Sequence, residues 1–593
     1  MARKCPTLEN VNPLLREMQN GEIACISLRA MEIEQELRKG SVKPFSEVIR
    51  ADVNDNQAMG QKPVTFIRQV MAVCAYPPLL HDDFIPSDVK ARANSILDEC
   101  GGRSAGAYTY SEGIHLIREH IAQYLQRRDG VQASAENVIL TAGASEALRS
   151  ILNVLNSPND GNRIGVMVPV PRDPSFTSLL NEFGMVEIDY FLEEDQEWSI
   201  SLNELSSALK AASSYCIPRA ILVINPGNPT GSVLNSNTME EIIQFAVRQK
   251  LVLLADESYQ FNAFGQGCFF QSFKKTMMLM SEPFSHLELV SIMSGSTGIL
   301  GECGLRCGCC ELMNIREDVI SVYKKSICVK MCPSVMGQIA LDCMICPPEP
   351  HEPSYPSFIQ ECRDIMQSLY EKATIAINAL NEIDGIQCNN YTGSTFVFPK
   401  IYIPERAVIE AKTKGQTPDT FYAMQLLEET GICSVPGALY GQIPGTYHLR
   451  WASKLNLKIW SRIEIMDDDE LQILRAKRLA ELQGQRNIGG QGDQAAAEEQ
   501  KAKEEEFKNQ ILTQVLSKEA RGRLSTISIA KPETGKMLEN MVINMARTGR
   551  IRSQLDDKEF IHLLEEVNRQ VKHNTPTVKF DRRRAALDSD DEF

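Results

Sequence analysis

The chain has 593 residues and a mass of 66.3 kDa, which is too long for one compact domain and predicts two to four domains. Its 43% hydrophobic and 23% charged residues exclude a wholly disordered or collagen-like protein, and its net charge of −15 argues against nucleic-acid binding along the whole chain. An odd number of 17 irregularly spaced cysteines favours reduced thiols in the cytoplasm or nucleus, and the hydrophobic pattern shows neither a signal peptide nor a membrane span.

Up to about Trp460, short apolar runs alternate with helical patterns. Residues 220–224 and 250–257 are aliphatic runs that end in turns, as expected of buried parallel strands, and residues 238–248 between them have helical spacing. This alternation predicts an α/β fold with a mostly parallel sheet. After Ile465 only helical patterns follow, so the second part is expected to be an all-α helical bundle.

Polar residues follow both of the predicted strands. Asn228 lies in the Pro- and Gly-rich turn 225–231 after the first strand, and the second strand ends at Asp256, with Tyr259 three residues further on. Open α/β sheets bind ligands at the carboxyl ends of their strands. These side chains can therefore reach one ligand, although an ordinary turn and a helix cap would contain the same residue types.

Together with the segments GAYTYSEG, SFKK, GECGLR and VPGALYGQ, these motifs resemble the alanine aminotransferase family over residues 7–455. The resemblance implies the fold of the fold-type I transferases that depend on pyridoxal 5'-phosphate (PLP), and a homodimer. A large domain is expected over residues 91–345 and a small α+β domain over residues 346–460, with residues 1–90 forming an N-terminal arm and part of the small domain. The family transfers the amino group of L-alanine to 2-oxoglutarate, which yields pyruvate and L-glutamate.

The resemblance also implies which side chains bind the cofactor. Asp256 would pair with the protonated pyridine nitrogen, and Asn228 and Tyr259 would bind the phenolic oxygen of the ring. Arg450 would bind the substrate carboxylate through its two-pronged guanidinium. The phosphate would be bound at a helix N-terminus and by nearby side chains, and would be reached by a tyrosine of the other subunit: Ala144, Ser145, Ser294, Arg306 and Tyr108.

One departure from the family pattern affects the chemistry directly. Thr297 stands where the family has the lysine that links covalently to the cofactor and moves the α-proton, and no lysine occurs between Lys275 and Lys324. A threonine hydroxyl cannot form that link and is a poor base near neutral pH. The expected result is weakened PLP binding and impaired transamination. An active transaminase that uses another lysine and a non-enzymatic dimeric scaffold are the alternatives.

Further departures concern the same region. Asp173 replaces a tyrosine that stacks on the cofactor ring, Asn54 replaces a glycine near the substrate, and Cys307 replaces a glycine after Arg306. By the same resemblance, the family's last helical segment, expected after Arg450, is missing, which predicts an incomplete small domain. Six cysteines do not have the spacing of zinc fingers, so buried free thiols are expected rather than a metal site: Cys303, Cys307, Cys309, Cys310, Cys328 and Cys332.

Residues 466–593 resemble the programmed cell death 5 family, with a junction at 461–466, a bundle over 467–572 and a disordered tail over 573–593. Met466 stands where an initiator would be in that family, which suggests either a gene fusion or a gene model that joins two separate genes. The resemblance implies DNA binding and regulatory protein partners, and Ser589 resembles a phosphorylation site. Five basic residues are the candidates for contacts with DNA phosphates, although a solvated tail is the alternative: Lys572, Lys579, Arg582, Arg583 and Arg584.

Overall fold

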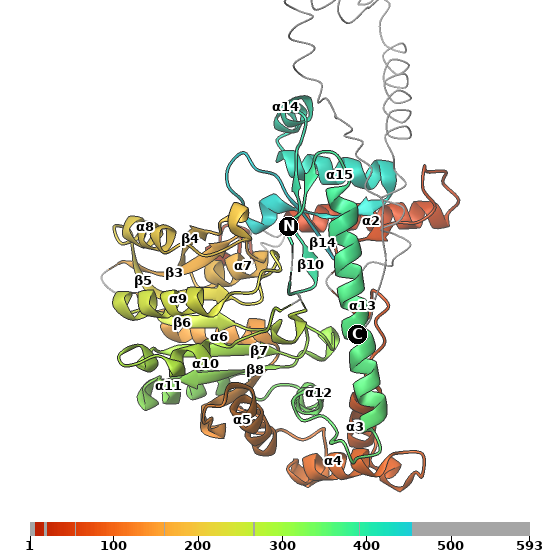
Figure 1. Ribbon diagram of the computed structural model, residues 1–593, viewed down its shortest axis with the longest axis vertical. Coiled ribbons are helices and arrows are strands. Elements are labelled where there is room, and N and C mark those ends of the chain that lie inside the picture. The colour runs from red at the N-terminus through yellow and green to blue at the C-terminus, as the bar shows by residue number, and fades with distance from the viewer. Residues whose placement is uncertain are drawn as a thin grey trace, which may run out of the picture. The chain divides into compact units, whose positions relative to one another are not determined.

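The computed structural model describes residues 6–16, 21–53, 55–158, 161–264, 267–390 and 392–452 (Figure 1). The chain divides into two units, Met1–Met466 and Asp467–Phe593, and every described residue lies in the first unit. The expected helical bundle over 467–572 therefore lies outside the described residues. None of the helices in the described part of the chain is long and apolar enough to span a membrane.

A seven-stranded sheet forms the centre of the first unit. Its strand order is β2-β8-β7-β6-β5-β3-β4, and the four pairings from β7 to β4 are parallel, whereas β8 pairs antiparallel with β7 and β2. The predicted strands over 220–224 and 250–257 are β5 and β6, so the predicted mostly parallel α/β sheet is confirmed. The strands are β2 (Val138–Thr141), β3 (Arg163–Val170), β4 (Val186–Phe191), β5 (Cys216–Ile224), β6 (Val252–Asp256), β7 (Leu289–Ser294) and β8 (Gly308–Met313).

Successive strand residues point to opposite faces of this sheet, and both sets are apolar, so helices pack on both faces. Ile221 and Leu253 pack with α8 (Leu202–Ala212), α9 (Ser236–Gln249) and α10 (Phe273–Leu279). Leu222 and Leu254, the next residues in the same strands, pack on the other side with α6 (Ala144–Leu155), α7 (Pro174–Glu182) and α11 (Glu317–Cys328). Helix α9 confirms the helix predicted over 238–248.

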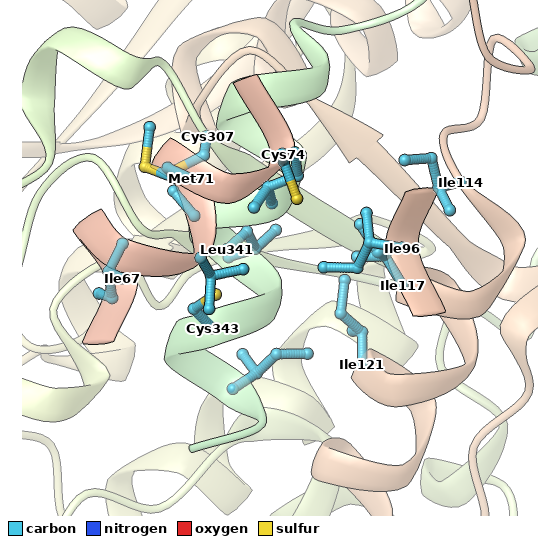
Figure 2. Close-up of a cluster of buried hydrophobic side chains, with 14 of the residues drawn as sticks. Ile67, Met71, Cys74, Ile96, Ile114, Ile117, Ile121, Cys307, Leu341 and Cys343 are labelled. Atoms are coloured by element: carbon cyan, nitrogen blue, oxygen red, sulfur yellow. The ribbon is translucent and has the colours of Figure 1, made fainter. Parts of the chain in front are cut away.

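A further apolar core lies between four helices and the sheet, where it includes residues of β2, β7 and β8 (Figure 2). These helices are α3 (Thr65–Ala75), α4 (Ser87–Asp98), α5 (His115–Asp129) and α12 (Val335–Ile345). Ile67 and Cys74 from α3, Ile96 from α4 and Leu341 from α12 are among the buried side chains that meet there. The residues from 64 onward therefore share a core with residues 114–125 and 335–345.

The small domain has its own core, to which both ends of the first unit contribute. Ile26 and Ile33 of α2 are buried with Leu427 of α15 and Trp451 of β14. The short strand β1 pairs in parallel with β12, which joins the N-terminal segment to this domain. The other elements are α1 (Pro13–Arg16), α2 (Gly21–Arg38), β1 (Ile49–Arg50), α13 (Tyr355–Asn381), β9 (Ile386–Gln387), β10 (Phe396–Val397), β11 (Lys400–Ile401), α14 (Glu405–Thr413), α15 (Pro418–Thr430), β12 (Ile432–Cys433), β13 (Val435–Pro436) and β14 (Leu449–Ala452).

Candidate cofactor site

The strand register brings the candidate residues to one edge of the large sheet. Ile224 at the end of β5 pairs with Asp256 at the end of β6, and Asp256 pairs with Ile292 of β7. Because β8 runs antiparallel between β7 and β2, its first residue, Gly308, lies beside both Ser294 and Thr141. The carboxyl ends of four strands therefore meet at this edge, where open α/β sheets bind ligands.

A cleft of about 270 Å³ lies at this edge. Its wall contains both cofactor-binding candidates and sites of departure from the family pattern: Ala144, Ser145, Asp173, Asn228, Asp256, Tyr259, Ser294, Thr297 and Arg306. The sequence motifs, although they are far apart along the chain, thus contribute to one cleft.

One end of the cleft is suited to a phosphate. Helix α6 begins at Ala144, so its unpaired backbone N–H groups and the positive end of its dipole lie in the wall. Arg306 Nη2 donates a hydrogen bond to the carbonyl oxygen of Ala142 over 3.3 Å, which holds the guanidinium beside the start of this helix. Gly143, with φ 87° and ψ 172°, makes room for it, since a Cβ there would lie 3.0 Å from Arg306 Nη2.

Ser294 completes this end of the cleft. Its Oγ accepts hydrogen bonds from the backbone N–H groups of Ser296 and Thr297, at 3.2 and 3.3 Å. Because the hydroxyl oxygen is the acceptor in both bonds, its own hydrogen can be donated to an anion.

The other end of the cleft is suited to a protonated pyridine ring. The buried Asp256 carboxylate accepts hydrogen bonds from the Oγ and the backbone N–H of Ser258, at 2.5 and 3.1 Å. Burial raises the pKa of Asp256, and the nearby carboxylate of Asp173 raises it further. A protonated ring nitrogen would favour the ionised form of Asp256, because it would pair with the carboxylate inside the protein.

Asn228 and Tyr259 lie at the same end. Asn228 Nδ2 donates to Asp173 Oδ2 over 3.4 Å and has a second hydrogen for a ring oxygen. Its Oδ1 is buried without a hydrogen-bond partner among the described residues. Tyr259 is buried and packs edge to face on Phe396, with 6.2 Å between the ring centroids. Together with the phosphate end, these groups fit pyridoxal phosphate.

Thr297 lies in the wall of this cleft, as the sequence predicts for the residue at the position of the lysine. Its Oγ1 is buried, and the described part of the chain supplies no hydrogen-bond partner for it. No lysine is among the described residues that line the cleft. The nearest lysines in sequence on the N-terminal side, Lys274 and Lys275, belong to α10, and Lys274 Nζ is paired with Glu311 Oε1 at 2.6 Å.

The family of this chain follows from comparisons with known proteins. Residues 69–477 match the family described as aminotransferase class I and II. The chain belongs to this family. Alanine aminotransferase 1 of Homo sapiens is 45% identical over 449 residues, which cover 75% of this chain and 90% of that protein. Alanine aminotransferase 2 of Xenopus laevis is 45% identical over 446 residues, which cover 75% of this chain and 83% of that protein.

Two further comparisons concern the fold and the second unit. The solved structure of an alanine aminotransferase from Pyrococcus furiosus has a TM-score of 0.60 and 21% identity, and the match covers 77% of this chain and 97% of that chain. This likeness shows the aminotransferase fold. Residues 474–583 match a family described as a double-stranded DNA-binding domain. This match lies within residues 466–593, which resemble the programmed cell death 5 family.

Two predicted residues of the aminotransferase unit (Met1–Met466) do not line the cleft. Arg450 of β14 is buried, its Nη2 donates to the carbonyl oxygen of Asp52, and its guanidinium lies 4.7 Å from the centre of the Phe396 ring. Phe396 also packs on Tyr259, so one aromatic side chain contacts both Arg450 and a residue of the cleft wall. Tyr108 is 75% exposed, and its contact with a partner subunit stays a prediction.

Other predicted residues of the chain lie outside the described residues. They are Asn54, the phosphorylation candidate Ser589 and the basic residues expected to contact DNA, Lys572, Lys579, Arg582, Arg583 and Arg584.

Sequence reasoning missed several residues of the aminotransferase cleft. Ser258 hydrogen-bonds to Asp256, and Ser296 and Cys303 are part of the wall. A serine two residues after an aspartate at a strand end is a known turn pattern, so Ser258 was detectable from the sequence. Cys303 and Ser296 have no such signal, because only the folding of the loop between β7 and β8 brings them to the cleft.

The prediction of buried free thiols is correct for three of the six cysteines and wrong for one. Cys307, Cys309 and Cys310 are free and buried, and burial raises the pKa of Cys310 to about 11. Cys328, the last residue of α11, is exposed, because its position is on the solvent side of the helix end. Cys303 and Cys332 are half-buried. Within the described ranges, no group of histidine, cysteine and acidic side chains could hold a metal ion.

Proposed function

We propose that the aminotransferase unit binds pyridoxal phosphate in the cleft and is impaired in the transfer of amino groups between L-alanine and 2-oxoglutarate. The proposal rests on the residues that line the cleft. Thr297 lies in the cleft wall with an unpaired hydroxyl, and no described lysine lines the same wall. The described wall of the cleft therefore has residues suited to this cofactor but no lysine amine that would bond to it.

The roles of the binding residues follow from their chemistry. The N-terminus of α6, Ser294 and Arg306 bind and orient the phosphate through N–H and O–H donors. The Asp256 carboxylate holds a proton on the pyridine nitrogen, and Asn228 and Tyr259 bind the phenolic oxygen. When bound, pyridoxal phosphate supplies an electron sink for the bonds at the substrate α-carbon. The Thr297 hydroxyl has a pKa far above neutrality, so it cannot remove the α-proton efficiently.

Reduction with borohydride tests this proposal, because it fixes an imine between PLP and a lysine. The purified chain is incubated with PLP, reduced, digested and examined by mass spectrometry, in parallel with the Thr297→Lys variant. We expect no stoichiometric adduct in the natural chain and an adduct at position 297 in the variant, together with a gain of alanine transamination. A stoichiometric adduct at any lysine of the natural chain would favour the active transaminase instead.

The scaffold alternative makes a different prediction for the same protein. A non-enzymatic scaffold would form a homodimer without binding any cofactor. Size-exclusion chromatography with light scattering measures the oligomeric state, and titration of PLP measures cofactor binding. Together they distinguish the scaffold from the proposed cofactor-binding unit, for which we expect a dimer that binds the cofactor. Tyr108, which is largely exposed, is the candidate for reaching the phosphate in the partner subunit. We therefore expect the Tyr108→Phe change to weaken cofactor binding if the tyrosine hydroxyl makes this contact.

The second unit is proposed to bind double-stranded DNA in the cytoplasm or nucleus. The match of residues 474–583 supports this function, and the basic residues from Lys572 to Arg584 are expected to contact phosphates. A DNA mobility-shift assay over a range of salt concentrations tests it. We expect binding that weakens steeply with salt, is lost when the five basic residues are replaced by alanine, and weakens in Ser589→Glu, which adds negative charge to the tail. Absence of binding at low salt would exclude this function.

A further inference from the structure

The departures at Thr297 and Asp173 are brought together in the cofactor cleft. Asp173 is held in place from two sides. Its Oδ1 accepts the backbone N–H of Ser175 at 3.0 Å as the N-cap of α7, and its Oδ2 lies 3.4 Å from Asn228 Nδ2. The carboxylate is therefore a fixed part of the cleft wall at the position where the family has an aromatic ring.

The charges along the cleft are unequally distributed. Arg306 is the cationic side chain among the described residues of the wall, and it lies at the phosphate end beside the start of α6. Asp173 and Asp256 both lie at the ring end, close enough for the charge of one to oppose ionisation of the other. A ligand that brings positive charge to the ring end would therefore be favoured over a neutral ligand of the same shape.

Two buried polar atoms of the same wall have no hydrogen-bond partner among the described residues, and both can accept a hydrogen bond. Asn228 directs its amide nitrogen to Asp173, which leaves the carbonyl oxygen Oδ1 buried without a partner in the described part of the chain. Thr297 Oγ1 is likewise buried and unpaired. Together with the Asp173 carboxylate, these atoms give the cleft wall three acceptor groups, as many as a primary ammonium group has N–H donors. An aldehyde has no hydrogen to donate to any of them.

We propose that this cleft selects the amine form of the B6 cofactor, pyridoxamine 5'-phosphate, over the aldehyde form and holds it without a covalent bond. The inference rests on the proposed function, namely that the cleft binds a B6 phosphate. The aldehyde form is normally retained by its covalent link to a lysine, and this chain has Thr297 instead. The amine form needs no such link, and its ammonium group gains charge-assisted hydrogen bonds at the acidic ring end.

The test compares three ligands of similar shape, of which only the first carries an ammonium group: pyridoxamine 5'-phosphate, its neutral alcohol analogue pyridoxine 5'-phosphate, and pyridoxal 5'-phosphate. Their dissociation constants are measured by calorimetry on the full chain after removal of endogenous ligand. We expect pyridoxamine phosphate to bind about tenfold more tightly than pyridoxine phosphate, as one added charge-assisted contact would produce. The alcohol is the main reference, because the aldehyde can also react with surface lysines.

Asp173→Asn is the matched variant, since it retains the capping oxygen and removes the charge. We expect it to abolish the advantage of about tenfold that pyridoxamine phosphate has over pyridoxine phosphate, whatever change in affinity the two ligands share. Thr297→Lys should shift the preference to pyridoxal phosphate. Equal affinity of the natural chain for the amine and the alcohol would overturn the inference without any variant, and so would an equal loss for all ligands in Asp173→Asn. Absence of binding by all three would overturn the proposed cofactor function as well.

Discussion

Asn56 Nδ2 donates a hydrogen bond to the carbonyl oxygen of Gly298 over 2.7 Å, which links the segment before α3 to the loop after β7. Asn56 is buried, and Gly298 directly follows Thr297. Gly301 in the same loop has φ 62°, and a Cβ there would lie 2.5 Å from the Asn56 side chain. The N-terminal segment thus fixes the loop that forms one wall of the cofactor cleft.

Asn56→Ala should destabilise the protein and weaken cofactor binding. Removal of the donor leaves the Gly298 carbonyl oxygen without this partner in a buried place, which costs about 1–3 kcal/mol. Urea unfolding measures the free energy, and ligand titration measures the affinity. Asn153→Ala, an exposed position in α6, is the control and should change the stability by no more than about 0.5 kcal/mol. Equal effects of the two substitutions would show that the Asn56 bond is unimportant.

Gly143→Ala should reduce the affinity for a phosphate-bearing ligand. The new Cβ would lie 3.0 Å from Arg306 Nη2, and an L side chain is strained at the backbone angles of Gly143. Gly130→Ala is the comparison, because Gly130 also has a positive φ, 71°, but has no neighbouring atom within 4 Å of its added Cβ. Both variants should lose stability, but only Gly143→Ala should lose affinity in a fluorescence titration of the cofactor. A similar loss of affinity in Gly130→Ala would argue against the contact with Arg306.

The sequence predicted the strands well because they have local signals, and it placed the cofactor-binding candidates at strand ends, where their binding roles stay a prediction. Aliphatic runs before Asn225 and Asp256 identify β5 and β6, and polar residues at parallel strand ends must meet at one edge. Motifs also identified Thr297 and Asp173, and the structure places both in the cleft wall.

The remaining features depend on contacts between distant segments. The insertion of β8 between β2 and β7 brings Arg306 to the start of α6, and no periodicity indicates this pairing. The Asn56 bond joins residues that are 242 positions apart, so it has no local signal. The contact of Arg450 with the Phe396 ring likewise depends on how β14 packs.

Lys274→Met should be strongly destabilising, because it leaves a buried acid without its counter-charge. Lys274 and Glu311 are 0% and 3% exposed, and Glu311 Oε2 has no hydrogen-bond partner among the described residues. Loss of one member of such a pair costs about 3–5 kcal/mol. The double change Lys274→Met/Glu311→Gln should cost less than the sum of the single changes. Urea unfolding of all variants checks this, with Lys275→Met, the half-buried neighbour in α10, as the control. Additive single effects would contradict the coupling.

Glu257 should make the stability depend on pH in a defined direction. This fully buried side chain accepts hydrogen bonds from the Phe273 backbone N–H and Ser291 Oγ, both at 2.8 Å, and lies 3.7 Å from Arg128 Nη1. Burial raises the pKa of Glu257 from its ordinary 4.5 to about 7, although Arg128 opposes this shift. The folded state therefore binds a proton more readily than the unfolded state between these two values.

The sign of the effect follows from this difference in proton binding. As the pH rises from about 4.5 to about 7, the contribution of Glu257 lowers the free energy of unfolding, by at most about 1.4 kcal/mol per pH unit. Glu257→Gln stays neutral and can accept from Phe273 while donating to Ser291, so this contribution should be absent from its urea-unfolding data. The exposed Glu240→Gln in α9 is the control variant. If Glu257→Gln and the natural protein show the same slope over this range, Glu257 is not the group that takes up the proton on folding.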